Sequence, residues 1–241
     1  MSDRTAVGSA IRAALLTAGP QAKVMAARKV ARDWRLGRLA FAFDVLMPNR
    51  PARPAEPQLL APSRMPRRGK GGSERGRIAL WHALAHIEFV AIDLALDMAG
   101  RFGAEMDREF VGEFLAVAAD EAMHFALLDR HLWRLGSRYG ELPAHDGLWQ
   151  AADDTRHDVA ARLAVVPMVL EARGLDVTPP TIERVRGQAT QWARASSSVY
   201  LTTRFVTSRS APSIFSPARR AAVKTPINYG FRSCADISTG A

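Results

Sequence analysis

Glu121 and His124 are the two residues of this chain whose types and spacing point most directly to chemistry. They form a Glu-x-x-His unit, and side chains three residues apart on a helix project from the same face. The unit lies on a stripe of three- and four-residue steps that should face a helical core; the other members are Phe110, Phe114, Val117 and Leu128. A buried carboxylate is costly without a compensating partner, and in helical bundles this partner is commonly a metal ion.

Two lone glutamates occupy similar inward positions in other segments. Glu88 is the single charge on a stripe made of Trp81, Leu84, Ala91, Ala95 and Met98. Glu171 is the odd polar residue on a stripe made of Ala160, Ala164 and Pro167. Bundles that hold two metals take Glu-x-x-His from each of two helices and a lone Glu from each of two others. The pattern therefore predicts a metal site, whereas the alternative for any one glutamate taken alone is a solvated position.

The other histidines carry weaker signals. His82 and His86 are four residues apart, a spacing compatible with a second ligand pair. His86 lies roughly opposite Glu88 around the helix, so we expect these two histidines to pack through hydrogen bonds or to support the metal ligands. We expect surface or loop positions for the histidines without informative spacing, which are His131, His145 and His157.

The segments that must carry these residues are helical. Apolar periodicity and helix stop signals predict helices at residues 4–18, 22–44, 77–101, 106–135 and 148–172, with a restart near residue 180. Residues 48–76 are rich in Pro, Gly and Arg and are expected to wrap over the helices. We therefore predict an all-α fold with N-terminal helices (1–46), a linker (47–76), a helical core (77–187) and a basic tail (188–241).

Several strings resemble one known family in its own order of motifs. They are HALAHIE (82–88), DEAMHF (120–125), YGELPAHDGLW (139–149), LEARGLD (170–176) and the proline-rich PNRPARP (48–54). The chain up to about residue 186 resembles the ferritin-like family called domain of unknown function 455. The resemblance implies a four-helix bundle with a carboxylate-bridged di-metal centre, in which iron is the expected metal and manganese is the alternative. It also implies that Glu88, Glu121, His124 and Glu171 are the ligands, and it implies no particular substrate.

A fourth metal-binding helix is missing from the last part of the sequence. After Gly187 there is no histidine, no second Glu-x-x-His unit and one acidic residue, Asp236, against seven Lys or Arg. Such a segment can be a disordered basic tail. However, one permitted codon set for residues 201–211, read from its third nucleotide, yields HDEIRHVAIG, which contains Glu-x-x-His. We therefore predict that residues 188–241 are a frameshifted translation that begins near residues 185–188.

Composition limits the remaining function classes. The formal net charge is +9, of which the tail contributes +6, so the rest of the chain carries an ordinary 9 − 6 = +3. The single cysteine, Cys234, excludes a disulfide framework. Because we find no signal peptide and no apolar stretch long and charge-free enough to span a membrane, we expect a cytoplasmic protein without a membrane partner.

Three functional hypotheses follow. The first is a di-iron redox enzyme in which Glu121 and Glu171 bridge two metals, with terminal ligands nearby, and in which dioxygen or peroxide reacts with a small-molecule substrate. The second is a tRNA-hydroxylase-like enzyme or a non-enzymatic metal- or RNA-binding helical protein; basic residues at 64–70 favour it, but no aromatic residues interleave with them. The third is that this chain is an impaired family member. We adopt the first for the family and the third for this chain.

Overall fold

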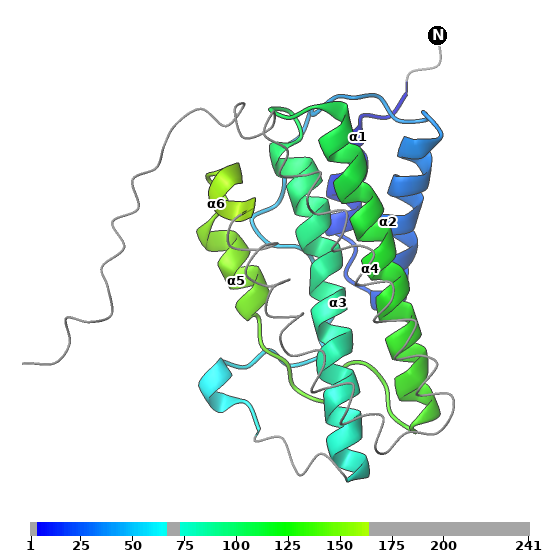
Figure 1. Cartoon of the computed structure of the whole chain (residues 1–241), viewed down its shortest axis with the longest axis vertical. Coiled ribbons are helices and arrows are strands. Elements are labelled where there is room, and N and C mark those ends of the chain that lie inside the picture. Colours follow the sequence, from blue (N-terminus) through cyan, green and yellow to red (C-terminus); the bar gives the residue numbers. More distant parts are fainter. Residues whose placement is uncertain (1–3, 67–72, 164–241) are drawn as a thin grey trace, which may run out of the picture.

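Two long helices, α3 (Glu74–Phe102) and α4 (Arg108–Arg134), lie side by side and antiparallel along the centre of the molecule (Figure 1). The computed structural model describes residues 4–66 and 73–163, and all regular structure of these residues is helical apart from two isolated bridges. The pair α3 and α4 forms the most extensive interface between helices in this part of the chain. The prediction of an all-α fold is therefore confirmed for the described residues.

A short polar side chain caps the N-terminus of each central helix. The Ser73 side chain accepts a hydrogen bond from the Gly76 amide at 3.1 Å, and the Asp107 side chain accepts one from the Phe110 amide at 2.7 Å. Each bond satisfies an amide that has no partner within its own helix. Because Ser73 is the cap, α3 begins at Glu74, three residues before the predicted start.

The helix predicted at residues 22–44 is too long at its end, because α2 spans Pro20–Arg35. Gly37 adopts a φ of 65° and its amide donates to the Trp34 carbonyl, while the Arg38 amide donates to the Asp33 carbonyl. These two bonds are the Schellman ending of a helix, which needs a left-handed residue that glycine adopts without strain. The first helix, α1 (Val7–Leu15), is likewise shorter than the predicted 4–18.

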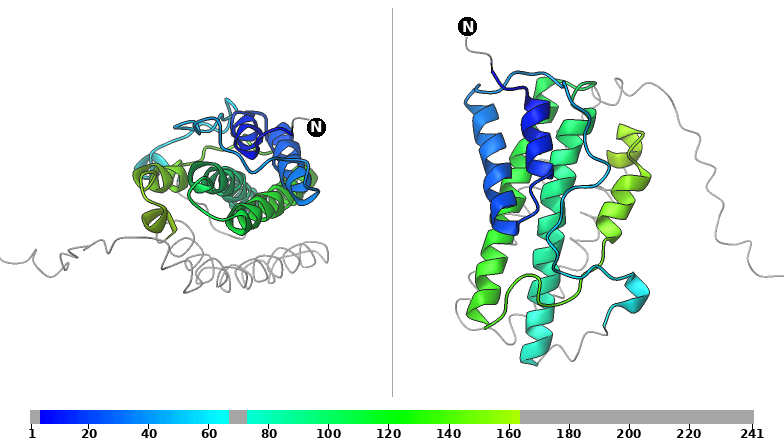
Figure 2. Two further views of the ribbon diagram at one scale, coloured as in Figure 1. Left: turned by 90° about the horizontal axis from the view of Figure 1, so that it is seen from above. Right: turned by 180° about the vertical axis from the view of Figure 1, so that it is seen from behind.

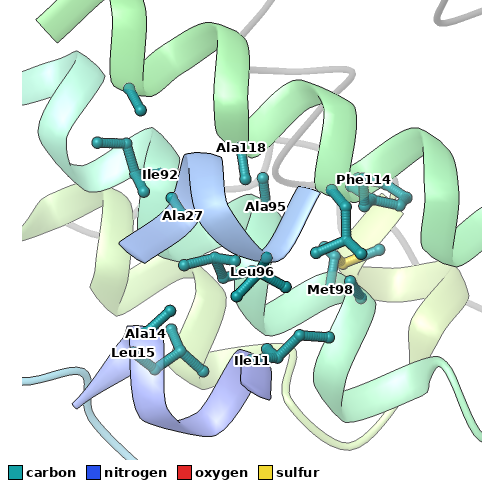
Figure 3. Packing of buried hydrophobic residues seen from close by; sticks show 14 of the residues in the cluster. Ile11, Ala14, Leu15, Ala27, Ile92, Ala95, Leu96, Met98, Phe114 and Ala118 are labelled. Atoms are coloured by element: carbon teal, nitrogen blue, oxygen red, sulfur yellow. The ribbon is translucent and has the colours of Figure 1, made fainter. Parts of the chain in front are cut away.

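Helices α1 and α2 cover one side of α3 and α4 (Figure 2). The main apolar core fills the space between these four helices and is closely packed in the region drawn in Figure 3. Its labelled members are Ile11, Ala14, Leu15, Ala27, Ile92, Ala95, Leu96, Met98, Phe114 and Ala118. Burial of these side chains holds the N-terminal helices against the central pair.

The single helix predicted at residues 148–172 is interrupted. The structure has α5 (Gly147–Asp154) and a separate α6 (Val159–Leu163). Between them, the Asp158 side chain accepts a hydrogen bond from the Ala161 amide at 2.6 Å, so Asp158 caps a new helix instead of continuing the old one. Trp149 and Ala152 of α5 pack with Val90 and Leu94 of α3 in a second, smaller apolar cluster.

The segment between α2 and α3 runs across α3 between the N-terminal helices and α5, as the rear view of Figure 2 shows. Its described part contains one 3₁₀ turn, η1 (Pro62–Arg64). Backbone bonds fix its described part at three places: the Val7 amide donates to the Ala40 carbonyl, the Ala52 amide donates to the Leu15 carbonyl, and the Leu60 amide donates to the Ala144 carbonyl. The described part of this linker therefore wraps over the helices as predicted.

The helix α3 is an exception to the expectation that no apolar stretch of this chain is long enough to span a membrane. An 18-residue window of this helix has a mean hydropathy of 1.5, which is apolar enough to cross a membrane by length and composition alone. In the described part of the chain, α3 alone has this property, and 61% of its window is buried inside the protein. A helix that is apolar on all sides is expected when other elements surround it. The central position of α3 accounts for its hydropathy.

Candidate metal centre

Glu88, Glu121 and His124 come together between α3 and α4. One ligand atom from each of the three residues lies within 4.8 Å of the others. His124 Nδ1 is 2.9 Å from Glu121 Oε2 and 3.6 Å from Glu88 Oε2. The Glu-x-x-His unit therefore presents both side chains on one face of α4, and this face meets the lone glutamate of α3.

The three side chains are almost inaccessible to solvent. The side-chain exposure is 0% for Glu88, 5% for Glu121 and 2% for His124. They interrupt stripes that are otherwise apolar, since Trp81 and Met98 on α3 and Phe114 and Leu128 on α4 are also buried. The antiparallel pairing of two inward stripes is sufficient to bring the three polar residues together.

Burial and mutual charge shift the pKa values of Glu121 and His124 strongly. Desolvation, followed by the charge of Glu88 and a hydrogen bond with it, raises the pKa of Glu121 to about 8. Burial alone would lower the pKa of His124, but hydrogen bonds and charge from Glu121 and Glu88 outweigh it and raise that pKa to about 9. Two carboxylates in one buried site repel each other, and a proton or a cation must compensate them.

The donor set fits a divalent metal ion. Two carboxylates and one imidazole, with donor atoms close enough to share one ion, suit iron, manganese or zinc. A bound cation would also offset the repulsion between Glu88 and Glu121. The described residues thus supply one lone glutamate and one Glu-x-x-His unit, which is half of the six-ligand set of di-metal bundles.

The fourth predicted ligand cannot be placed. Glu171 lies outside the described residues, as do the other residues predicted beyond position 163. The structure therefore brings together three of the four residues that the sequence singled out. The frame change predicted near residues 185–188 also falls outside the described part and stays a prediction.

His82 and His86 hydrogen-bond the loop that follows α4. The Gly140 amide donates to His82 Nε2 at 3.0 Å, while His86 Nδ1 lies 2.9 Å from the Tyr139 hydroxyl and His86 Nε2 lies 3.2 Å from the His145 carbonyl oxygen. Burial is the main cause that lowers the pKa of both histidines to about 4, so their rings are neutral. The prediction that they pack through hydrogen bonds is confirmed.

The prediction for the remaining histidines is wrong for one of them. His131 is buried on α4, and its ring meets the Trp81 ring edge-on with a centroid distance of 4.5 Å. His145 and His157 are exposed and lie outside the helices, as predicted. His131 lacks a spacing signal in the sequence because its packing partner comes from a different helix.

Sequence reasoning missed two further buried carboxylates on α3. Asp93 pairs with Lys23 Nζ at 2.5 Å and with Arg53 at 3.2 Å, and its side chain is completely buried. Asp97, also completely buried, pairs with Arg101 and Arg162, each at 2.7 Å. These carboxylates lie on a different face of α3 from Glu88. The available signal was the apolar composition of α3 on all sides, which predicts burial of every face.

Comparison with known proteins identifies the family of this chain. The family model described as "Protein of unknown function (DUF455)" matches residues 16–199. An "Uncharacterized protein" of Haemophilus influenzae is 46% identical over 151 residues, which are 59% of this chain and 52% of the relative. The chain therefore spans about half the length of that relative. No solved structure matches the chain. The match to the family model covers most of the sequence, and the chain belongs to the DUF455 family of proteins of unknown function.

Proposed function

We propose that the DUF455 fold is a ferritin-like bundle with a carboxylate-bridged di-iron centre, and that the intact family acts as a redox enzyme. The observation that carries the proposal is the convergence of Glu88, Glu121 and His124 in a buried space between two antiparallel helices. Bound iron would supply redox chemistry with dioxygen or peroxide toward a small-molecule substrate. Manganese is the alternative metal, because it accepts the same donor types.

The residues of this chain have distinct roles in the proposed centre. Glu88 would bind from α3, and Glu121 and His124 would bind from α4 on the opposite side. Burial of all three would keep bulk water away from the metal and strengthen its electrostatic attraction to the carboxylates. Since the pKa values of Glu121 and His124 are about 8 and about 9, metal binding at neutral pH would release protons from this group.

The proposal for this particular chain is that its centre is incomplete. With Glu171 counted, the sequence supplies four ligands from three helices, whereas di-metal centres of this class use six ligands from four helices. We therefore expect weak metal binding and little redox activity from the chain as it stands. The proposed frameshift explains the deficit, because the shifted frame permits a second Glu-x-x-His unit at residues 201–211.

Anaerobic titration with iron(II), followed by calorimetry and elemental analysis, tests this function. The chain as it stands should hold at most one iron per molecule, and the version with the shifted frame restored should approach about two. Glu121→Ala should abolish the gain, whereas Glu105→Ala, at an exposed position outside the site, should leave it unchanged. If the restored protein binds no metal, the di-iron proposal is wrong. If the unaltered chain binds two irons tightly, the ligand deficit is wrong.

The RNA-directed alternative remains a second proposal with less support. It rests on the basic residues at 64–70, of which 67–70 lie outside the described residues. Filter binding of tRNA at two salt concentrations distinguishes it, because phosphate contacts weaken steeply with salt. Salt-dependent retention of tRNA by the full chain would favour this alternative over a small-molecule substrate.

A further inference from the structure

A pocket of about 690 Å³ lies between the linker and the start of α5. This volume falls within the range of pockets that hold small molecules. Its lining combines apolar side chains with charged ones, including Leu59, Leu60, Arg53 and Trp149. Nothing in the proposed metal chemistry uses this pocket.

The pocket is separate from the candidate metal centre. Arg53, in the pocket lining, pairs with Asp93 of α3. Asp93 follows Glu88 by five residues, so the two side chains are about 140° apart around the helix axis at about 100° per residue. The helix α3 therefore stands between the pocket and the face that carries Glu88.

Two hydrogen-bond donors of residues that line the pocket have neither a hydrogen-bond partner nor an ion-pair partner in the described part of the chain; they are Nη1 of Arg53 and Nε1 of Trp149, and both atoms are buried. Nη2 of Arg53 makes no hydrogen bond but lies 3.2 Å from an Asp93 oxygen. A buried acceptor of the lining, Oδ1 of Asp146, also lacks a hydrogen-bond partner, while the other oxygen of this carboxylate pairs with Arg50. The Trp149 residue is only 3% exposed. A buried donor without an acceptor costs free energy, so two such donors in one pocket favour a ligand that brings acceptor oxygens.

The charges around the pocket also favour an anion. Three cations, Lys23, Arg50 and Arg53, pair with two carboxylates, Asp93 and Asp146. The cluster therefore carries an excess of one positive charge, and Arg53 provides a guanidinium fork that matches a carboxylate. The Arg53 side chain is 17% exposed, so solvent screens its charge less than it screens the charge of Arg50, whose side chain is 67% exposed.

From these observations we propose that the pocket binds a small monocarboxylate with an apolar body. Its carboxylate accepts hydrogen bonds from Arg53 and Trp149, which compensates both donors and the excess charge. Its apolar part contacts Leu59, Leu60 and the indole ring of Trp149. A phosphate dianion fits less well, because the cluster has a single unbalanced positive charge and Asp146 lies in the lining.

Binding of benzoate to the full chain, measured by calorimetry, tests the proposal. Benzyl alcohol and benzamidine keep the ring but replace the carboxylate with a neutral group and a cation, and inorganic phosphate tests the other oxyanion. We expect benzoate to bind at least about tenfold more tightly than each of the three, since a hydrogen bond to a charged group is worth about that factor. Undetectable benzoate binding at about 10 mM, or tighter binding of any comparison compound, would overturn the proposal.

Variants then locate the binding site. Trp149→Phe removes the indole N–H with little loss of apolar volume, and Arg53→Lys keeps the charge beside Asp93 but removes the fork; each should weaken benzoate binding about tenfold. Leu59 is 39% exposed, so Leu59→Glu and its neutral match Leu59→Gln should both fold. Leu59→Glu should repel benzoate, whereas Leu59→Gln should retain most of the affinity. Equal affinities for the Leu59 pair would show that benzoate binds elsewhere.

Discussion

Lys23 Nζ lies 2.5 Å from Asp93 Oδ1, and both side chains are completely buried although the residues are 70 positions apart in the sequence. The ammonium group also donates to the Ala52 carbonyl at 2.9 Å. One interaction site thus joins α2, the linker and α3. Burial is the largest influence on both groups and lowers the pKa of Lys23 while it raises the pKa of Asp93, so the pair depends on its internal partners.

Removal of one member of the buried Lys23–Asp93 pair should therefore destabilise the folded protein strongly. Lys23→Met leaves the Asp93 carboxylate buried with less compensation and should lower the free energy of unfolding by about 3–5 kcal/mol. Urea denaturation followed by circular dichroism measures this change. The matched control is Lys29→Met, because Lys29 also pairs with an aspartate, Asp33, but is 68% exposed and should cost less than about 1 kcal/mol. Equal losses for the two variants would contradict the importance of burial.

The stability of the metal-free protein should fall as the pH rises from about 6.5 to about 9, because below this range His82, His86 and His131, whose pKa values are lowered to about 4, make the opposite contribution. The pKa of Glu121 rises from 4.5 to about 8 on folding, so within this range the folded state holds a proton that the unfolded state has lost. The stabilisation by His124, whose pKa rises from 6.5 to about 9, is complete below pH 6.5 and is lost through pH 9. Thermal unfolding in the presence of a chelator, at pH 7 and pH 9, measures the effect.

The same comparison of melting temperatures, made on a variant, shows whether Glu121 causes the pH dependence. In Glu121→Gln the carboxylate proton is absent, so the difference in melting temperature between the two pH values should shrink. A pH dependence as steep as in the original chain would assign the effect to other groups. Metal affinity should show the opposite trend and increase with pH, because the ion competes with protons for Glu121 and His124.

Gly37 should be required for the end of α2. Its φ of 65° is strained for residues with a Cβ atom, and no atom lies within 4 Å of the position that a Cβ atom would occupy, so the cost of Gly37→Ala is conformational and not steric. We expect a loss of about 1–2 kcal/mol in the free energy of unfolding for Gly37→Ala. Gly37→Asn should lose less, because asparagine tolerates this backbone conformation better. An equal loss for both variants would argue against this explanation.

The frame of the last segment has a direct test in the coding DNA. The nucleotides that encode residues 201–211, read from the third base, should yield Glu and His in Glu-x-x-His spacing. If they do not, the frameshift hypothesis is wrong and the basic segment is authentic. The family match reaches residue 199, which lies beyond the predicted frame change at residues 185–188. Sequencing from about codon 180 to codon 215 covers the predicted frame change, the end of the family match and the codons for residues 201–211.

The sequence was sufficient to predict the central helices and the polar group between them. Inward stripes identify Glu88, Glu121 and His124 because each interrupts a regular apolar spacing, and such spacing depends only on the residues of one helix. The Asp93 pairs and the buried position of His131 could not be predicted in this way. Their partners, Lys23, Arg53 and Trp81, come from distant segments, and only the packing of those segments against α3 and α4 brings them into contact.

The ends of helices were also predicted incorrectly, and the cause lies in single residues at those ends. The prediction for α2 continued past Gly37 because the following residues are apolar, although glycine in a left-handed conformation ends the helix. The prediction for residues 148–172 likewise gave the apolar periodicity more weight than Asp158, whose side chain caps a new helix. In both places a single residue with a specific backbone role outweighed the periodicity of its neighbours.

The pairing of Asp93 with cations from upstream segments has a practical consequence for shortening this protein. A chain that started at α3 would retain Glu88, Glu121 and His124, but would lose both Lys23 and Arg53 and leave a carboxylate without its cations on the central helix. Residues 7–53 therefore belong to the same folding unit as the candidate metal centre. Recombinant fragments intended for metal binding should keep the N-terminal helices, and fragments that omit them should be recovered mainly as aggregates.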